Sequence, residues 1–290
     1  MSAGGGSQGV GADAGSSATG RLKVACVQLN SREDVAANRL VAEHFVRYAA
    51  AVGARLIVLP ETWTYKGSLQ RLPEVSETAD GASNSLLAGL AAELGVYVLA
   101  GSLYARTGTR DYYFNTSVLF GPDGTALATY RKLHLFDAVA GEVVYRESDN
   151  LLPGADIVTA QVDGVSVGFT ICYDLRFPEL YRTLALRGAR ILLAPSAFTT
   201  PTGRDHWEVL LRARAIENGC FVVAADQYGE HAPGRSCYGH SMIVDPWGAI
   251  LAQASDGVGL CLAELDLANV DKVREQIPSL MYRRPEIYGL

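Results

Sequence analysis

The segment Gly168-Phe-Thr-Ile-Cys-Tyr-Asp-Leu-Arg-Phe-Pro-Glu-Leu180 decides the fold, because in it an apolar strand passes through a sharp polar turn into a helix. The apolar run predicts the strand, and we expect the helix to begin near Pro178. Cys172 stands where the strand ends, so rigid backbone would hold its thiol at a sheet edge that a substrate can reach. The positive end of the helix is expected to lower the pKa of this thiol. The alternative is a buried core cysteine, which is common in apolar strands.

Two other predicted strands end at a charged residue. In Arg55-Leu-Ile-Val-Leu-Pro-Glu-Thr-Trp63 the apolar run meets Pro60, which cannot extend a central strand, and Glu61 follows at once. In Ala128-Thr-Tyr-Arg-Lys-Leu-His-Leu-Phe-Asp137 the strand ends at Lys132. The carboxyl end of a buried strand is where α/β proteins place their chemistry. Considered alone, Glu61 could equally be a solvated carboxylate in a loop, and Lys132 could be an ordinary surface lysine.

Together, Pro60-Glu61, Arg131-Lys-Leu-His134 and Cys172-Tyr-Asp174 resemble the nitrilase (carbon–nitrogen hydrolase) superfamily, whose members use a Glu–Lys–Cys triad. All three motifs appear in the family's order, and the resemblance runs from about Leu22 to the C-terminus. The late segments are most similar to the deaminated-glutathione amidase branch, with the ω-amidase branch a close neighbour. The further motifs that carry the resemblance are Pro195-Ser-Ala-Phe198, His206-Trp-Glu-Val-Leu-Leu-Arg-Ala-Arg-Ala-Ile-Glu217, Tyr238-Gly-His-Ser-Met-Ile-Val-Asp-Pro-Trp-Gly248, Gly259-Leu-Cys-Leu-Ala263 and Arg283-Arg-Pro-Glu-Ile-Tyr-Gly289.

The resemblance implies amide hydrolysis through a thioester. Glu61 would take the thiol proton, and Cys172 would attack the carbonyl carbon. Lys132 and the backbone N–H of Tyr173 would stabilise the oxyanion. Glu61 would then protonate the leaving ammonia or amine and activate the water that releases the acid, with no metal or organic cofactor. The resemblance also supplies Glu147, expected to orient the lysine or to position substrate; its alternative is a solvated loop residue.

The substrate is expected to carry a free carboxylate. Arg176 follows the turn, and an arginine at a pocket mouth can hold a carboxylate through two hydrogen bonds. Its alternative is a salt bridge to Glu179 or Asp174. The resemblance places Ser196 and Phe198 in the pocket wall. A small ω-amide of a keto or amino acid fits these residues, and deaminated glutathione and α-ketoglutaramate both belong to that class.

Three other readings compete with this amidase. In the first, His134 is the base of a Cys–His pair, because strand alternation would place it on the same face as Lys132. In the second, the chain is a true nitrilase or an N-carbamoyl-amino-acid hydrolase, which would share the triad but form different products. In the third, the fold is a non-catalytic scaffold. The intact set of Glu61, Lys132 and Cys172 argues against that third reading.

Composition narrows the class of protein. Hydrophobic residues make up 49% of the 290 residues, which indicates a globular fold. The net charge of −6 argues against non-specific nucleic-acid binding. No apolar run approaches the roughly 20 residues of a membrane-spanning helix, and no secretion signal opens the chain. The five cysteines are widely spaced and match no zinc motif, so we expect no metal site. We expect the protein to work in a reducing cytoplasm.

The chain is expected to consist of a flexible Gly/Ser-rich tail over residues 1–20 and one hydrolase domain over residues 21–290. From Leu22 onward strands and helices alternate, with several hairpins, which predicts a mixed sheet covered on its outer face. The sequence alone leaves open whether there is one sheet or two. The resemblance implies an α/β fold of the αββα type, a four-layer sandwich with two mixed sheets between outer helices, assembled as a homodimer or larger.

Two helices have features that the structure can test. The helix expected over Glu33–Val52 places Val41, Phe45, Tyr48 and Val52 along one apolar face. A later helix is expected to be capped by Asp205 and to end at Gly219, after Asn218. Asn115-Thr-Ser117 matches a glycosylation sequon, which carries no meaning without secretion.

Overall fold

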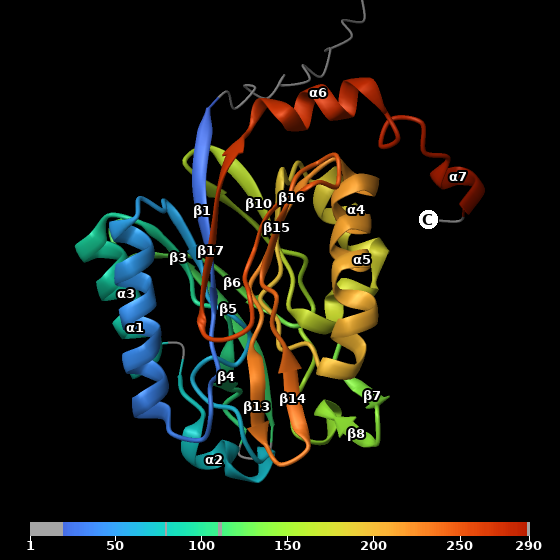
Figure 1. Ribbon diagram of the computed structural model, residues 1–290. Coiled ribbons are helices and arrows are strands. Elements are labelled where there is room, and N and C mark those ends of the chain that lie inside the picture. The colour runs from blue at the N-terminus through green and yellow to red at the C-terminus, as the bar shows by residue number, and fades with distance from the viewer. Residues whose placement is uncertain (1–19, 79, 110–111, 289–290) are drawn as a thin grey trace, which may run out of the picture.

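Two β-sheets pack face to face in this computed structural model, and helices cover the outer face of each (Figure 1). The structure describes residues 20–78, 80–109 and 112–288, so the expected tail lies outside the described residues except for Gly20. The four-layer αββα sandwich expected from the family resemblance is thereby confirmed. No helix in these ranges is long and apolar enough to cross a bilayer.

The first sheet has seven strands and mixed directions. In spatial order it contains β17 (Gly259–Asp266), β1 (Arg21–Gln28), β2 (Leu56–Val58), β3 (Tyr97–Leu99), β5 (Tyr113–Phe120) and β4 (Leu103–Arg106), and β6 (Ala126–Arg131) pairs with β5. Strands β1, β2 and β3 run parallel, and the other pairings are antiparallel.

The second sheet has six strands, in the order β16 (Ile250–Gln253), β15 (Met242–Val244), β12 (Phe221–Ala224), β11 (Ile191–Leu193), β10 (Val165–Phe169) and β9 (Thr159–Val162). Its central strands β10, β11 and β12 are parallel. Two separate hairpins, which the sequence did not predict, are β7 (Asp137–Ala140) with β8 (Val143–Arg146) and β13 (Tyr228–Ala232) with β14 (Arg235–Tyr238). Both lie at the lower end of the sandwich in Figure 1.

Four helices form the outer layers. Helices α1 (Val35–Ala51) and α3 (Ala82–Leu94) cover the first sheet, and α4 (Pro178–Leu186) and α5 (Thr200–Asn218) cover the second (Figure 1). The shorter elements are η1 (Leu69–Arg71), α2 (Leu72–Val75), η2 (Glu147–Asp149), η3 (Cys172–Arg176), α6 (Ala268–Gln276) and α7 (Pro285–Tyr288).

One apolar cluster joins the inner faces of the sheets. Val24 and Leu56 enter it from the first sheet, and Val167 and Leu193 from the second, all fully shielded from solvent. Burial of an aliphatic side chain stabilises the fold by about 1.5–3 kcal/mol. This cluster therefore holds the two sheets together, so residues that follow β2 and β10 can meet across the interface between them.

The apolar face predicted for the first helix is wrong at Val41 and Tyr48, although Phe45 packs against the core as expected. Helix α1 buries Asn38, Ala42, Val46 and Ala49, whereas Val41 and Tyr48 are 41% and 51% exposed. The buried set follows the helical spacing too, and its alanines let the helix lie close to its neighbours. Asn38 donates to the carbonyls of Arg32 and Thr64, so this polar residue is satisfied where it is buried.

The cap predicted for the later helix is also wrong. Helix α5 begins at Thr200, with Thr199 at the cap position and Pro201 in its first turn, so Asp205 lies inside the helix. Proline is favoured in a first turn, because its fixed φ suits the helix and its missing N–H has no partner there anyway. The predicted end is confirmed, because Gly219 takes the left-handed conformation with φ 55°.

Candidate active site

Glu61 lies three residues beyond β2, at the interface of the two sheets, and its side chain is only 4% exposed. Its backbone N–H donates to the carbonyl of Ser196 (3.2 Å), which follows β11 of the other sheet. Its carboxylate oxygen Oε1 accepts from Asn115 Nδ2 (2.7 Å) and from Lys132 Nζ (2.9 Å). Both donors bind the same oxygen, which leaves Oε2 available to a third group.

Lys132 immediately follows β6 and is buried between two carboxylates. Its Nζ lies 2.9 Å from Glu61 Oε1 and 2.9 Å from Glu147 Oε2. Its backbone is held as well, because its N–H donates to the carbonyl of Asn115 and its carbonyl accepts from Gly154. The predicted charged residue at this strand end is therefore an interior lysine and not a surface one.

Glu147 begins η2 and reaches inward to this lysine. Its Oε2 also accepts the backbone N–H of Phe136 (2.8 Å), and its side chain is 18% exposed. It is therefore neither fully solvated nor fully buried. This position fits a residue that orients Lys132 better than it fits a solvated loop residue.

Cys172 stands at the turn between β10 and α4 with a backbone φ of 47°. This left-handed conformation is uncommon for a residue with a side chain, and such strained residues cluster at functional sites. Its N–H donates to the carbonyl of Pro195 (2.9 Å). The turn is fixed further by the fully buried carboxylate of Asp174, which accepts from the Ile171 N–H (2.8 Å) and from the Tyr130 hydroxyl (2.6 Å).

Burial and neighbouring charges set the protonation states of the three groups. Burial alone would raise the pKa of Glu61, but the charges of Lys132 and Lys66 outweigh it and hold the pKa below its usual value. Burial would lower the pKa of Lys132, but the two carboxylates raise it well above its ordinary value. The resting cluster therefore contains a carboxylate and an ammonium ion.

The expected lowering of the Cys172 pKa is wrong. Burial, and next the negative charge of Glu61, raise the pKa of this thiol well above its ordinary value, although Lys132 acts in the opposite direction. The thiol and the Glu61 carboxylate lie close enough to influence each other's pKa. The helix that was expected to stabilise a thiolate begins only at Pro178, after the turn η3. The cluster therefore holds a neutral thiol beside a carboxylate that can accept its proton.

Cys172 opens onto a small hollow of about 20 Å³, whose wall includes Phe136, Tyr173, Arg176 and Phe198. Three of these four wall residues are aromatic. Phe198 and Tyr173 both line this hollow, beside the thiol.

Arg176 lies in the wall of this hollow. Its guanidinium carbon is 5.2 Å from the centre of the Phe198 ring, and it donates weakly to His206 Nδ1 (3.3 Å). Within the described ranges it forms no ion pair with Asp174 or Glu179, the alternative partners considered from the sequence. Its charge is therefore available to a carboxylate that enters the hollow.

Ser196 does not line this hollow. Its side chain is fully buried and donates to the carbonyl of Ala194 (3.1 Å), while its own carbonyl accepts from the N–H groups of Glu61 and Gln227. The prediction that it forms part of the pocket wall is therefore wrong for this hollow, because its hydroxyl is bonded to the backbone of its own segment. Its contribution is to hold the backbone of Glu61.

The ring of His134 is engaged by residues of the Cys172 turn. Strand β6 ends at Arg131, so strand alternation does not extend to His134. Its ring contacts Asp174 (Nδ1–Oδ1 2.7 Å) and stacks on Phe177 with ring centres 3.6 Å apart. These contacts indicate a structural residue that braces the turn of Cys172.

Sequence reasoning missed two residues of the cluster. Asn115, 1% exposed, donates to Glu61, so its side chain is not accessible to glycosylation. A polar residue within an apolar strand was the available signal. Lys66 follows the Glu61 loop, and its charge helps to lower the pKa of that carboxyl. No local pattern marked it.

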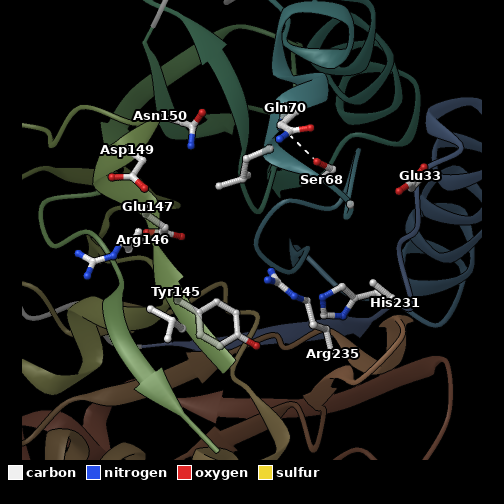
Figure 2. Close-up of a pocket in the computed structure, with 14 residues that line it drawn as sticks. Glu33, Ser68, Gln70, Tyr145, Arg146, Glu147, Asp149, Asn150, His231 and Arg235 are labelled. Atoms are coloured by element: carbon white, nitrogen blue, oxygen red, sulfur yellow. Dashed lines mark hydrogen bonds between the residues drawn. The ribbon is translucent and has the colours of Figure 1, made fainter. Parts of the chain in front are cut away.

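A larger cavity of about 550 Å³ adjoins the cluster at Glu147 (Figure 2). It is bounded by η1, the β7–β8 hairpin with η2, and the β13–β14 hairpin. Such a volume is typical of small-molecule sites, which span about 300–1,000 Å³. The buried cluster therefore has space for a ligand on its Glu147 side as well as at Cys172.

Comparison with known proteins shows which family this chain resembles. A family model described as carbon-nitrogen hydrolase matches residues 23–275. Deaminated glutathione amidase of Bos taurus is 42% identical over 276 residues, which cover 92% of this chain and 83% of that protein. Omega-amidase NIT2 of Homo sapiens is 36% identical over 270 residues, covering 93% and 97%.

Solved structures agree with these relatives. The C. elegans NitFhit protein matches with a TM-score of 0.88 at 39% identity, over 93% of this chain and 67% of that chain. A variant of the amidase from Nesterenkonia sp. AN1 matches with a TM-score of 0.77 at 27% identity, over 92% and 96%. That amidase carries the acetamide moiety of fluoroacetamide bound covalently at its active-site cysteine.

Proposed function

This chain belongs to the carbon–nitrogen hydrolase family and is an amidase, and we propose that it hydrolyses a small carboxylate-bearing amide, deaminated glutathione or a similar ω-amide, through a thioester at Cys172. The observation that carries the proposal is the buried cluster itself. A buried thiol on strained backbone has its pKa raised by the neighbouring Glu61 carboxylate, whose own charge is maintained by Lys132.

The reaction begins with transfer of the thiol proton to Glu61 as the Cys172 sulfur attacks the amide carbon. The carbonyl oxygen becomes an oxyanion, stabilised by Lys132 and by the N–H of Tyr173. The carbon–nitrogen bond then breaks, and Glu61 returns its proton to the leaving nitrogen. Water, deprotonated by Glu61, attacks the thioester, and the acid leaves as the thiol is restored.

Removal of the thiol proton during the attack avoids a free thiolate in the resting site, where its negative charge would be unfavourable. The cluster already holds the carboxylates of Glu61 and Glu147 against the ammonium of Lys132. A free thiolate would add another negative charge in a buried place, which is costly. Transfer of the proton to Glu61 leaves the number of charges in the cluster unchanged.

The acyl half of the substrate would lie at Cys172, next to the residues that line the hollow. Arg176 would bind its carboxylate, and Phe198 and Tyr173 would flank the chain. This arrangement suits an α-keto acid whose distal carboxyl group, at the end opposite the keto acid group, forms the amide. Deaminated glutathione and α-ketoglutaramate share that acyl group and differ in the amine that leaves.

The test is product analysis with the purified protein. We expect a keto acid and the matching amine from ω-amides, without CO2, and no turnover of simple nitriles. Release of CO2 from N-carbamoyl amino acids, or acid formation from nitriles, would move the assignment to those activities. Failure with every compound, together with a Cys172 thiol inert to iodoacetamide, would favour a non-catalytic scaffold.

We further propose that residues 21–290 act as one hydrolase domain in the cytoplasm and assemble into a homodimer or larger. All five cysteines are free, which is consistent with a reducing compartment. Apolar side chains near the C-terminus are exposed, among them Met281, Tyr282 and Ile287. Measurement of the molar mass by light scattering, for the full chain and for a Met281→Glu variant, tests the assembly.

A further inference from the structure

Two adjacent buried polar residues, Asp226 and Gln227, have no role in the chemistry derived so far. They follow strand β12 and are 0% and 1% exposed. Strand β12 is parallel to β11, so the segments that follow the two strands lie side by side, and a bridge between Ser196 and Asp226 joins them. Burial of a polar side chain is costly unless it is hydrogen-bonded, so the partners of these two residues show what they hold in place.

Gln227 holds the backbone of the base Glu61. Its Nε2 donates to the carbonyl of Glu61 (3.0 Å) and to Ser31 Oγ (3.0 Å). Its Oε1 accepts the N–H of Ser31 (3.0 Å), so both ends of the amide are fixed by one residue that follows β1 of the other sheet. Because the Glu61 N–H is bonded to the carbonyl of Ser196, both backbone polar groups of the base are engaged.

Asp226 holds the backbone of Phe198, in the wall of the hollow at Cys172. Its Oδ1 accepts the Phe198 N–H (2.8 Å), and its Oδ2 accepts the Gly239 N–H (3.0 Å). The Gly239 N–H has a second acceptor in the carbonyl of Gln227 (2.9 Å), whereas within the described residues the Phe198 N–H bonds to Asp226 only. Burial raises the pKa of Asp226 well above its usual value, and these two N–H groups act in the opposite direction.

The position of Phe198 in turn affects Arg176. The Phe198 ring centre lies 5.2 Å from the guanidinium carbon of Arg176 and 5.1 Å from the ring centre of Trp207. A guanidinium group is attracted to the face of an aromatic ring, so a displaced ring would displace the cation as well. Asp226 therefore acts, through Phe198, on the residue to which the acyl carboxylate is assigned.

We propose that Asp226 and Gln227 are positioning residues with separate tasks: Gln227 positions the base Glu61, and Asp226 positions the wall that binds the acyl half. The inference rests on the proposed function and deepens it, because it names what holds each part of that site. A displaced base slows the chemical steps, whereas a displaced wall weakens binding. The two residues should therefore affect different kinetic constants.

The test compares Gln227→Met and Asp226→Ala with wild type. The values of kcat and KM are measured with α-ketoglutaramate, and the rate of alkylation of Cys172 by iodoacetamide is measured by mass spectrometry. Asn218→Ala is the matched control, because Asn218 is also fully buried and donates to a backbone carbonyl, that of Arg214 (2.9 Å). It lies at the C-terminal end of α5, whereas the hollow adjoins the N-terminal end.

The two variants should show opposite effects. Gln227→Met should lower kcat by about 10- to 100-fold and change KM by less than about threefold, because a small displacement of a reacting group is enough for such a loss. Alkylation of Cys172 should slow as well, since Glu61 takes the thiol proton in that reaction too. Asp226→Ala should raise KM by about tenfold and change kcat by less than about threefold. Its alkylation rate should stay near that of wild type, because iodoacetamide carries no carboxylate.

Two milder variants keep the test valid if the stronger ones do not fold. Ser31→Ala removes one acceptor of Gln227 and should lower kcat by about threefold without a change in KM. Asp226→Asn should restore a KM near that of wild type. Its amide oxygen can still accept the Phe198 N–H, while Gly239 keeps its bond to the carbonyl of Gln227.

Several outcomes would overturn the inference. Joint changes of kcat and KM in both variants, or the same separation in Asn218→Ala, would show a general effect on the fold. Alkylation of Cys172 at the wild-type rate in Gln227→Met would exclude the role of Gln227, and a KM for Asp226→Asn as high as that of Asp226→Ala would exclude the role of Asp226. Absence of ω-amide turnover in wild type would reject the proposed function and the role of Asp226 with it, while the alkylation rates would still decide the role of Gln227.

Discussion

Lys132 Nζ lies 2.9 Å from Glu61 Oε1, and the two side chains are only 1% and 4% exposed. Burial of an unpaired ion is costly, so the attraction between these two charges offsets the cost of removing each from water. It also keeps the carboxyl ionised in a place where burial would protonate it. The pair therefore serves both the stability of the interface between the sheets and the ionised state in which Glu61 can accept a proton.

Replacement of the base should abolish most of the activity. Glu61→Gln keeps the shape of the side chain but cannot accept the thiol proton, so the rate of acylation should fall by about 10²- to 10⁴-fold. Single-turnover mixing with an ω-amide measures this step directly. The matched control is His134→Ala, which should retain acylation because that ring is engaged with Asp174 and Phe177. Loss of acylation in the histidine variant but not in Glu61→Gln would make histidine the base.

Removal of the central cation should destabilise the fold. Lys132→Met leaves Glu61 and Glu147 buried together without their partner, and such broken pairs cost about 3–5 kcal/mol. Urea unfolding of wild type and variant measures the difference. A variant as stable as wild type at neutral pH would contradict the account of this pair.

The same variant has a predicted pH dependence. In wild type the pKa of Glu61 is below its ordinary value of 4.5, so this group stabilises the fold above that pH. Without Lys132, burial should outweigh the remaining charge of Lys66 and raise the folded pKa above 4.5, and stability is then lost as the pH rises through it. The destabilisation should therefore be larger at about pH 8 than at about pH 5. An equal effect at both values would contradict this reasoning.

Cys172 should be a thiol in the resting protein. Because burial and Glu61 raise its pKa well above the ordinary 9.0, the difference in thiolate ultraviolet absorbance between wild type and Cys172→Ser should show no step up to pH 9.0. A thiolate signal at neutral pH would instead support the effect of the helix end expected from the sequence.

Asn115 should act as a positioning residue for Glu61. Asn115→Leu removes a donor to a charged group, so kcat should fall by about tenfold, with little change in KM. The acidic limb of the pH profile should also move upward, because the Glu61 carboxylate loses a partner. Ser117→Ala, which removes a buried hydroxyl and the same sequon, is the control and should leave both unchanged. A shift in KM alone would assign Asn115 to substrate binding.

Arg176 should recognise the acyl carboxylate. Arg176→Ala should raise KM for ω-amides of keto acids by about 10- to 100-fold, since a charged hydrogen-bonded contact is lost. Amides without a carboxylate should be affected far less. An unchanged KM for the acidic amides would exclude this role.

Features set by local sequence were predictable. Pro60 ends its strand before Glu61, and Cys172 sits between an apolar run and a helix, so both placements could be derived from the residues alone. Features set by packing were not predictable in this way. The face that α1 buries depends on its neighbours, and the Cys172 pKa depends on Glu61, which is far away in the sequence.

The hairpins around the large cavity were also missed. Strands β7, β8, β13 and β14 are short and mostly exposed, so they lack the apolar alternation that marks a half-buried strand. No sequence pattern therefore marks Arg235. Its place opposite Gln70 and Asn150 follows only from the tertiary structure (Figure 2).

The central claim is that Cys172 carries the acyl group during amide hydrolysis. Mass spectrometry of protein quenched in acid during turnover of an ω-amide tests it most directly. We predict the acyl mass on the peptide that contains Cys172, absent from the peptides of the other four cysteines. A Cys172→Ala protein should form neither adduct nor product. Product formation by that variant at the wild-type rate, or an acyl group on another residue, would contradict the account.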